Sequence, residues 1–211
     1  SWAYKYEDYP ASDEYGILGN VLEQQYKEGI YVGYRYFDTF GVDVRYPFGF
    51  GLSYTKFEIA TKSIDAEKSV VKLKVAVKNA GTEYSGKEVV QVYLAKPQGT
   101  IKCERHTLCA FAKTKELRPN ESEELTLTFD LADFAVYDER DAKYVLQSGK
   151  YGVFIGNSIK DITTVAVLNL DAEVVTEICK SVCKKRGEFN EITADIKDET
   201  YSADLPVIEI K

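Results

Sequence analysis

An antiparallel β sandwich is the fold class that this all-β sequence predicts, with an irregular segment before it and a helix and tail after it. Three observations lead to this prediction. Apolar and polar residues alternate over short stretches of residues 55–170, turn residues separate these stretches at fairly regular intervals, and about seven of them fit into a little over one hundred residues. The chain therefore divides into residues 1–54, 55–170 and 171–211.

Each expected strand has its own pattern. Over residues 71–78, valine and leucine alternate with lysine, as in a strand with one face in a core and one in water. The run 89–94 is apolar almost throughout and predicts a more fully buried strand. The other strands are expected at residues 57–59, 107–113, 125–131, 151–155 and 165–167. This size and strand count are typical of immunoglobulin or fibronectin sandwiches, and the strands lack the inter-sheet cysteine pair of antibody domains, which favours the fibronectin type.

Tyr151 has two interpretations. It follows a Ser-Gly-Lys turn and precedes a late strand. It can be the corner tyrosine whose hydroxyl ties a loop to the start of that strand, or simply a half-buried strand aromatic.

The flanking regions differ from the sandwich. Residues 1–54 contain ten of the sixteen tyrosines with little periodicity, which predicts irregular chain. In the tail, Asp171 can cap a helix that ends at Gly187, with acidic residues early and basic residues late. One side of this helix would carry Val174, Val175, Ile178 and Val182. Residues 205–210 then form a short strand-like piece that needs another element to cover it.

Composition excludes several classes of protein. With 45% hydrophobic and 29% charged residues, the 211-residue chain is neither disordered nor membrane-spanning. A net charge of -7 argues against nucleic acid or a membrane surface as a partner. Four cysteines are too few for a disulfide scaffold, and no secretion signal is seen, so we expect a cytoplasmic, bacterial protein rather than a secreted one. Because the chain starts at Ser1 and lacks methionine, we expect a processed protein or a piece of one.

Few residue groups suggest chemistry. The single histidine, His106, has no motif around it and is expected at the surface. Neither Cys103 with Cys109 nor Cys179 with Cys183 has zinc-site spacing, so they are expected to be packing residues or stray thiols. We therefore predict no metal and no cofactor.

Two short motifs have ordinary explanations. The run Gly49-Phe50-Gly51 lacks the third glycine of a phosphate loop and predicts a turn. The run Asn120-Glu121-Ser122 is formally a glycosylation acceptor, which is uninformative without a known compartment. The many carboxylates are expected to be solvated surface groups.

The most specific motifs lie near the amino end. Residues 26–38 read YKEGIYVGYRYFD, and residues 46–57 read YPFGFGLSYTKF. Together they closely resemble the carboxy-terminal signature of family 3 glycoside hydrolases of the β-glucosidase type. In that family such a segment leaves the α/β-sandwich domain and enters a fibronectin type III-like domain. The resemblance extends over residues 1–170 and continues at residues 75–81, 86–93, 117–122 and 149–158.

Two departures from the family pattern leave the fold intact. Asn120 stands where a glycine is usual, and asparagine tolerates the left-handed backbone conformation that glycine would supply. Ala110 stands in place of the glycine of a usual Gly-Phe pair.

The resemblance places the chemistry outside this chain. Retaining glycosidases use two carboxyl groups about 5 to 5.5 Å apart. In the family, the nucleophilic aspartate sits on a barrel domain and the acid/base glutamate on the body of the α/β sandwich, and neither stretch is present here. No catalytic residue is therefore implied, and Glu28 is not a candidate. Residues 171–211 resemble the connection found in permuted bacterial relatives, in which the barrel follows the fibronectin-like domain.

These observations predict a non-catalytic fragment of a β-glucosidase that supports the catalytic domains. Its expected partners are the barrel and the α/β sandwich of the parent, which would act on a β-glucoside or oligosaccharide. An alternative is a carbohydrate-binding or adhesive module whose aromatic residues stack on sugars. The candidates for that stacking are Trp2, Tyr4, Tyr6, Tyr9 and Tyr15. A third alternative is self-association of the fragment through exposed aromatic residues.

Overall fold

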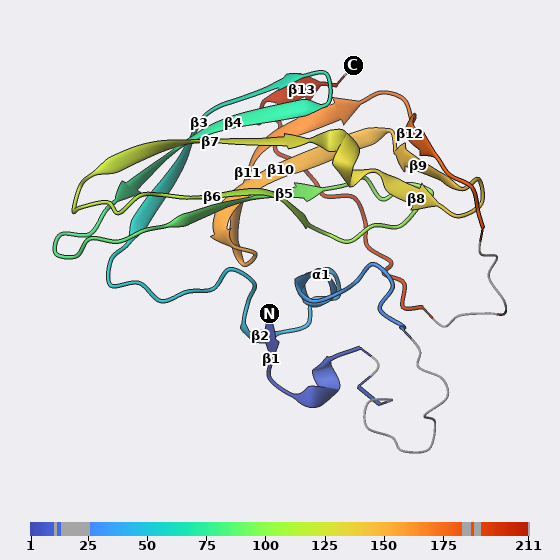
Figure 1. Ribbon diagram of the computed structural model, residues 1–211, viewed down its shortest axis with the longest axis horizontal. Helices are drawn as coiled ribbons and strands as arrows, with labels where there is room; N and C mark the ends of the chain where they lie inside the picture. Colours follow the sequence, from blue (N-terminus) through green and yellow to red (C-terminus); the bar gives the residue numbers. More distant parts are fainter. Residues whose placement is uncertain (11, 14–25, 183–186, 188–190, 211) are drawn as a thin grey trace.

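Two β-sheets packed face to face form the centre of the protein in the computed structural model, which describes residues 1–10, 12–13, 26–182, 187 and 191–210. One sheet has the strand order β3-β4-β7 and the other the order β13-β11-β10-β5-β6 (Figure 1). The strands of the first sheet are β3 (Phe57–Glu67), β4 (Val70–Asn79) and β7 (Ser122–Asp130). Those of the second are β5 (Val89–Ala95), β6 (Thr107–Lys113), β10 (Gly149–Ser158), β11 (Asp161–Leu170) and β13 (Val207–Glu209). The seven expected strands and the sandwich are confirmed.

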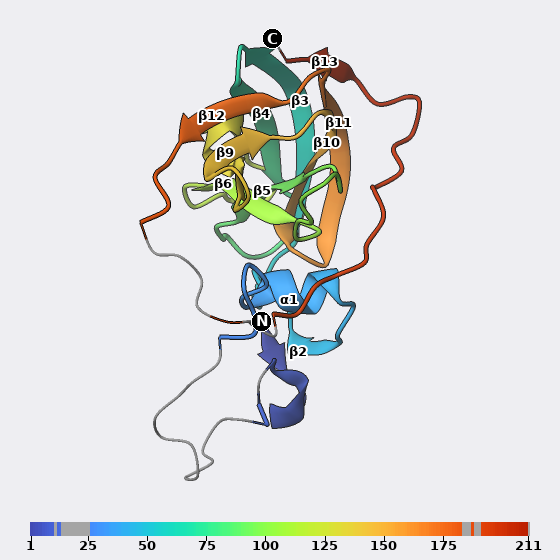
Figure 2. The ribbon, with the colours of Figure 1, turned by 90° about the vertical axis from the view of Figure 1, so that its right-hand side faces the viewer.

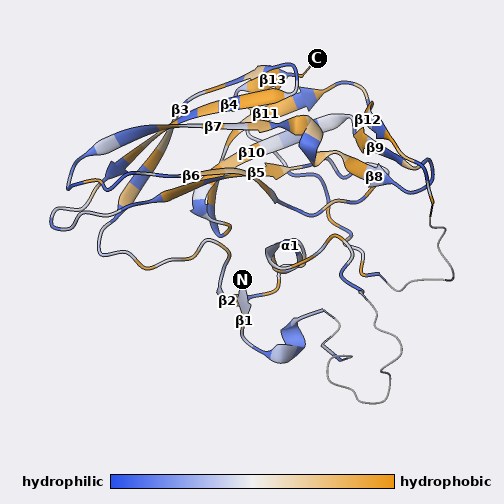
Figure 3. Ribbon diagram, in the orientation of Figure 1, coloured by the Kyte–Doolittle hydropathy of each residue, from blue (hydrophilic) through white to orange (hydrophobic). Residues whose placement is uncertain are grey.

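The main core lies between the two sheets. On β4 the apolar residues that alternate with lysines are fully buried, and they pack against residues of β5, β10 and β11. Each buried valine or leucine contributes about 1.5–3 kcal/mol relative to an exposed one. The β4 residues in this core are Val71, Leu73, Val75 and Val77. Figure 3 shows β4, β5 and β11 largely in the hydrophobic colour.

Strand β5 is buried on both faces, which explains its continuous apolar run. Val92 and Leu94 point into the main core, whereas Tyr93 and Ala95 belong to a second cluster on the outer side of the five-stranded sheet. Tyr34 and Tyr201 pack against this second cluster. The outer face of this sheet is therefore covered by chain from both ends of the sequence.

Tyr151 is a corner tyrosine. Its side chain is 1% exposed, and its hydroxyl donates a 2.7 Å hydrogen bond to the backbone oxygen of Gln147, four residues earlier. The bond ties the turn before β10 to the start of that strand. The alternative interpretation, a half-buried strand aromatic, is wrong.

The helix expected after Asp171 is also wrong. Residues 174–178 form strand β12 (Val174–Ile178), which pairs antiparallel with β9 (Lys143–Leu146). Strand β8 (Val136–Asp138) completes a three-stranded sheet in the order β12-β9-β8. Four of the five β12 residues are β-branched and favour a strand once a partner edge is available. Residues 179–182 are not helical, and residues 183–186 of the expected helix lie outside the described residues.

The amino-terminal segment is mostly irregular, as expected, and lies outside the five-stranded sheet. Its regular elements are β1 (Trp2–Ala3), the 3-10 helix η1 (Tyr6–Asp8), α1 (Tyr34–Thr39) and β2 (Val44–Tyr46). A second 3-10 helix, η2 (Leu131–Phe134), follows β7. Figure 1 shows α1 directly below the sandwich, with the β1-β2 ribbon on its far side. None of the helices in the described residues is long and apolar enough to cross a membrane.

The carboxy-terminal tail turns back along the molecule. Residues 191–206 have no regular secondary structure and run from the level of α1 to the opposite end of the sandwich (Figure 2). There β13 pairs parallel with β11, with Ile208 opposite Leu168. The short terminal strand expected at residues 205–210 is confirmed, and β11 is the element that covers it.

Candidate functional site

The contact between α1 and the five-stranded sheet contains several buried polar side chains. It joins residues 33–48 to strands β5, β6 and β10 through aromatic packing, a buried hydrogen bond between Asp38 and His106, and the approach of Arg35 to the buried Lys96–Glu104 ion pair. These contacts attach α1 and its flanking residues to the outer face of the sheet.

Tyr34 anchors α1 on the sheet. Its ring stacks on Phe48 with centroids 4.7 Å apart and meets Tyr93 edge to face at 6.1 Å. Its hydroxyl oxygen accepts a 2.8 Å hydrogen bond from the backbone N–H of Leu108 on β6. Gly33 begins the helix with a φ of +62°, a conformation that favours glycine. The YVGYRYFD motif therefore encodes a helix start followed at once by an aromatic anchor.

Gly49 lets the chain approach the sheet closely. Its φ is +85°, and a Cβ atom at this position would lie 2.5 Å from Nε2 of Gln91 and 2.8 Å from the backbone oxygen of Asn157. The N–H of Phe50 closes the turn on the oxygen of Pro47 at 3.1 Å. The turn expected at residues 49–51 is confirmed. The turn places Phe48 against the ring of Tyr34.

His106 is not a surface residue, contrary to expectation. It is 7% exposed, and its Nδ1 lies 2.7 Å from Oδ2 of Asp38, which is on α1. Its ring meets that of Phe154 edge to face at 4.7 Å. Its Nε2 is buried and has no hydrogen-bond partner within the described part of the chain. The expectation fails because α1 supplies both the cover and a carboxylate from a distant part of the sequence.

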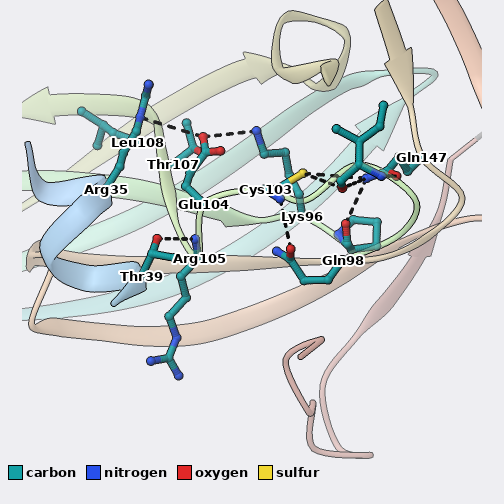
Figure 4. A network of polar contacts seen from close by, with 12 residues as sticks. Arg35, Thr39, Lys96, Gln98, Cys103, Glu104, Arg105, Thr107, Leu108 and Gln147 are labelled. Atoms are coloured by element: carbon teal, nitrogen blue, oxygen red, sulfur yellow. Dashed lines mark hydrogen bonds and ion pairs between the residues drawn. The ribbon is translucent and has the colours of Figure 1, made fainter. Parts of the chain in front are cut away.

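Glu104 is the centre of the second polar group (Figure 4). Its carboxylate accepts from Lys96 at 3.2 Å and from the hydroxyl of Thr107, and it lies 3.9 Å from Nε of Arg35 on α1. Burial would raise the pKa of Glu104, but Lys96, Thr107 and Arg35, together with a backbone hydrogen bond, outweigh it and lower the pKa. The carboxylate is therefore held charged as a bridge between the sheet and α1.

Gln147 organises the loop between β5 and β6. Its side-chain oxygen accepts from the N–H of Ile101 at 2.9 Å, and its Nε2 donates to the oxygens of Ile101 at 2.9 Å and Pro97 at 3.2 Å. Figure 4 shows Gln147 and Gln98 both next to Cys103. The same loop carries Glu104 onward to β6, so its shape positions the ion pair.

The cysteines are packing residues in the described structure. Cys103, Cys109 and Cys179 are free thiols, and Cys183 lies outside the described residues. Burial raises the pKa of Cys103 to about 11 and also raises that of Cys109. Both thiols are thus protonated and weakly reactive near neutral pH. The described residues contain no group of three or more His, Cys, Asp or Glu side chains arranged to hold a metal ion.

Several of the aromatic residues named as candidates for sugar stacking are exposed. Trp2, Tyr4 and Tyr6 are 67%, 65% and 53% exposed, whereas Tyr9 is half-buried and meets Phe37 at 5.5 Å. Tyr15 lies outside the described residues. Trp2 pairs with Tyr46 across the β1-β2 ribbon, and the ring of Tyr46 lies 5.1 Å from that of Phe50. The amino-terminal segment therefore carries several exposed aromatic side chains.

Sequence patterns alone missed the anchoring residues Asp38, Lys96, Glu104 and Gln147. One signal was available, because Lys96 directly follows the nearly continuous apolar run of β5, where a charge requires a partner. No comparable local signal distinguishes Asp38 or Glu104 from the many solvated carboxylates.

Comparisons with known proteins agree with this architecture. Residues 88–159 match the fibronectin type III-like domain family. A β-glucosidase of Ruminococcus albus is 40% identical over 214 residues, which cover 99% of this chain and 22% of the relative. The thermostable β-glucosidase B of Acetivibrio thermocellus is 34% identical over 85% of this chain and 23% of its own length.

Solved structures give the same result. A β-glucosidase from Paenibacillus barengoltzii superposes with a TM-score of 0.80 and 37% identity, over 86% of this chain and 21% of the other. The β-glucosidase of Kluyveromyces marxianus in complex with glucose gives a TM-score of 0.77 and 32% identity over 83% of this chain and 21% of the other. The chain thus spans about a fifth of the length of the relatives it matches. The resemblance to the carboxy-terminal region of family 3 β-glucosidases, with its fibronectin type III-like domain, is confirmed.

Proposed function

We propose that this chain is the non-catalytic fibronectin type III-like region of a family 3 β-glucosidase and that it supports the catalytic domains. Residues 55–170 are then the domain itself, residues 1–54 the end of the α/β-sandwich domain, and residues 171–211 a connecting tail. One observation carries the proposal. The chain matches β-glucosidases over nearly all of its own length but over only about a fifth of theirs.

The parent would hydrolyse terminal β-D-glycosidic bonds with retention of configuration, using carboxyl groups on its other domains. The buried carboxylates described in this chain support such a division of labour. Asp38, Glu104 and Asp138 lie against His106, Lys96 and Arg140, respectively. Each of these carboxylates thus has a partner within the chain.

The surface for this support is the apolar side of the β1-β2 ribbon. Trp2, Tyr46 and Phe50 are 67%, 45% and 48% exposed; Trp2 and Tyr46 pair across the ribbon, and the ring of Tyr46 lies 5.1 Å from that of Phe50. Contiguous exposed aromatic residues mark interaction sites. We infer that the remaining domains of the parent cover them.

An activity and binding assay tests the proposal. The pure chain should be folded and should release no nitrophenol from an aryl β-glucoside. The remainder of the parent, expressed separately, should bind the chain, and Trp2→Ala with Tyr46→Ala should weaken this binding at least about tenfold. Tyr137→Ala, at an exposed tyrosine on β8, is the matched control. Turnover by the chain alone, or binding equally strong in both variants, would contradict the proposal.

Exposure of the same aromatic residues favours a second candidate, a sugar-binding module. Aromatic rings flat on a surface can stack on pyranose faces, and Trp2 and Tyr4 are the most exposed of those named for this role. Calorimetric titration with cello-oligosaccharides separates the two. Millimolar or tighter binding that disappears in Trp2→Ala would favour the module, and absence of heat would favour the supporting role. Sedimentation of the same sample reveals any self-association through this surface.

We also propose that the parent works in a reducing compartment, such as the bacterial cytoplasm. The free thiols of Cys103 and Cys109 support this location. Fractionation of cells that produce the parent, followed by an activity assay, tests it.

A further inference from the structure

The tail residues 191–201, here named the strap, contact three parts of the molecule that are distant from one another in sequence. These parts are the loop 27–31, the loop between β5 and β6, and the middle of strand β10. Figure 2 shows the tail running along one side of the molecule, past α1 and the sandwich. A connecting linker would not need such contacts.

The first contact is with the loop 27–31 of the YKEGIYVGYRYFD motif. The N–H of Ile192 donates to the backbone oxygen of Lys27 at 2.9 Å, and the N–H of Ala194 lies 3.4 Å from the hydroxyl oxygen of Tyr31. Ala194 and Tyr31 are 5% and 3% exposed. The ring of Tyr31 meets that of Phe40, which follows α1, at 5.1 Å. The strap therefore shares a buried contact with the loop, and the loop in turn packs on the end of α1.

The second contact is with the loop between β5 and β6. Asp198 accepts a 2.5 Å hydrogen bond from the N–H of Gln98, and Glu199 pairs with Nε of Arg105 at 2.7 Å. The backbone N–H of Arg105 also donates to the hydroxyl of Thr39 on α1 at 2.9 Å. The strap and α1 are thus held by the same short stretch of sheet-connecting loop.

The third contact places Tyr201 over Gly152. A Cβ atom on Gly152 would lie 2.5 Å from Cε1 and 2.7 Å from the hydroxyl oxygen of Tyr201, so only glycine leaves room for this ring. A glycine inside a strand commonly marks such a close approach. Tyr201 also packs in the second cluster with Phe154, and burial raises the pKa of its hydroxyl to about 12. Tyr201 is thus a half-buried anchor between the strap and the sandwich.

Beyond the strap, β13 fixes the end of the tail. The N–H of Val167 donates to the oxygen of Pro206, and the N–H of Ile210 donates to the oxygen of Asn169, both at 2.9 Å. Ile210 is 8% exposed and belongs to the main core. Because both ends of residues 191–210 are attached, the segment between them has little conformational freedom.

We propose that residues 191–201 act as a strap that holds the loop 27–31 against the sandwich, and that Tyr201 on Gly152 is its latch. Loss of the latch frees the strap and the loop together, while the sheets stay folded. This role does not depend on the activity of the parent, because every contact that carries it lies within this chain.

Native-state hydrogen exchange of the full chain tests the proposal. In Tyr201→Ala, the amides of Ile192, Ala194 and Tyr31 should exchange at least about tenfold faster, because the strap opens locally. The amides of Val75 and Leu127, in the middle of the three-stranded sheet, should be unchanged. Tyr144→Ala removes a half-exposed tyrosine on β9 and is the matched control, which should accelerate none of these amides.

Gly152→Ala addresses the same latch from the opposite side and serves if Tyr201→Ala does not fold. It should accelerate the same three amides, because the added methyl group displaces the tyrosine ring. Unchanged exchange at Ile192 in a folded variant would overturn the proposal. Equal acceleration at Ile192 and Val75 would overturn it as well, since the tail would then open only with the whole molecule.

Discussion

The two outer faces of the sandwich differ sharply, although residues of both sheets form the core between them. The outer face of β3-β4-β7 carries Lys72, Lys74 and Lys78 in water. The outer face of the five-stranded sheet carries Tyr93, Ala95 and Phe154, which are buried under α1 and the tail. A sheet with one solvated face shows clean alternation, whereas a sheet covered on both faces does not. The apolar run of β5, which does not alternate, therefore marked the sheet whose outer face is covered by other segments of the same chain.

The open face and the covered face also differ in how they use charge. Lysines on β4 stand opposite residues such as Asp65 and Glu58 on β3 and are exposed to solvent. Beneath α1, Lys96 and Glu104 are almost completely shielded from water. Exposed pairs contribute little to stability, while removing one partner of a buried pair is costly. On the covered face a buried charge pair thus lies beside α1, with Arg35 of α1 3.9 Å from Glu104.

The largest expected effect comes from a matched pair of phenylalanines. Phe154 is 8% exposed beneath α1. Its change to alanine should lower the free energy of unfolding by about 3–5 kcal/mol, because the substitution leaves a cavity between His106 and Tyr93. Phe111 is 70% exposed on β6, and its change to alanine should lower the free energy of unfolding by less than about 0.5 kcal/mol. Urea denaturation of both variants measures the difference. Equal costs would mean that the outer cover contributes nothing to stability.

Glu104→Gln should give the next largest effect and lower the free energy of unfolding by about 3 kcal/mol near neutral pH. The substitution leaves the charge of Lys96 buried without a counterion. The folded protein lowers the pKa of Glu104, so the stabilisation is present above the unfolded pKa and is lost as pH falls through the folded one. The stability curves of the two proteins should therefore converge in acid. Urea denaturation across a pH series measures this, and a gap that stays constant down to the lowest pH would exclude Glu104 as its source.

The smallest effect concerns a turn at the end of the open sheet. Asn120 has a φ of +64°, and its N–H donates to the oxygen of Asn79 at 2.9 Å. Asn120→Ala should cost about 1 kcal/mol, because alanine is strained in this conformation, while Asn120→Gly should change stability by less than about 0.5 kcal/mol. Thermal unfolding of the two variants checks this. A stable alanine variant would show that the turn relaxes to another conformation.

Much of the fold was predictable because its signals are local. The alternation on β4, the turn at Gly49, the left-handed Asn120 and the corner position of Tyr151 each depend on residues within a few positions. The sequence also predicted correctly that Cys103 and Cys109 are packing residues, since no metal-site spacing surrounds them. The family resemblance rested on equally local motifs at residues 26–38 and 46–57.

The errors share a different cause. Val174–Ile178 has a plausible helical periodicity, yet it forms a strand because β9, thirty residues earlier in the chain, offers an open edge. His106 has no local partner, yet it is buried because α1 brings Asp38 to it. In both cases the deciding neighbour is distant in sequence, and propensity yields to tertiary contact.

The sequence by itself therefore determined which stretches are strands of the sandwich, where its turns lie, and which family of proteins it resembles. Only the tertiary structure decided that the outer face of one sheet is covered, that Glu104 and His106 hold that cover, and that the tail returns as a strap over Gly152. The physical reason is that strand patterns and turns depend on neighbouring residues. Whether a charge is buried, or a tyrosine ring packs on a glycine, depends instead on which distant segments of the chain meet.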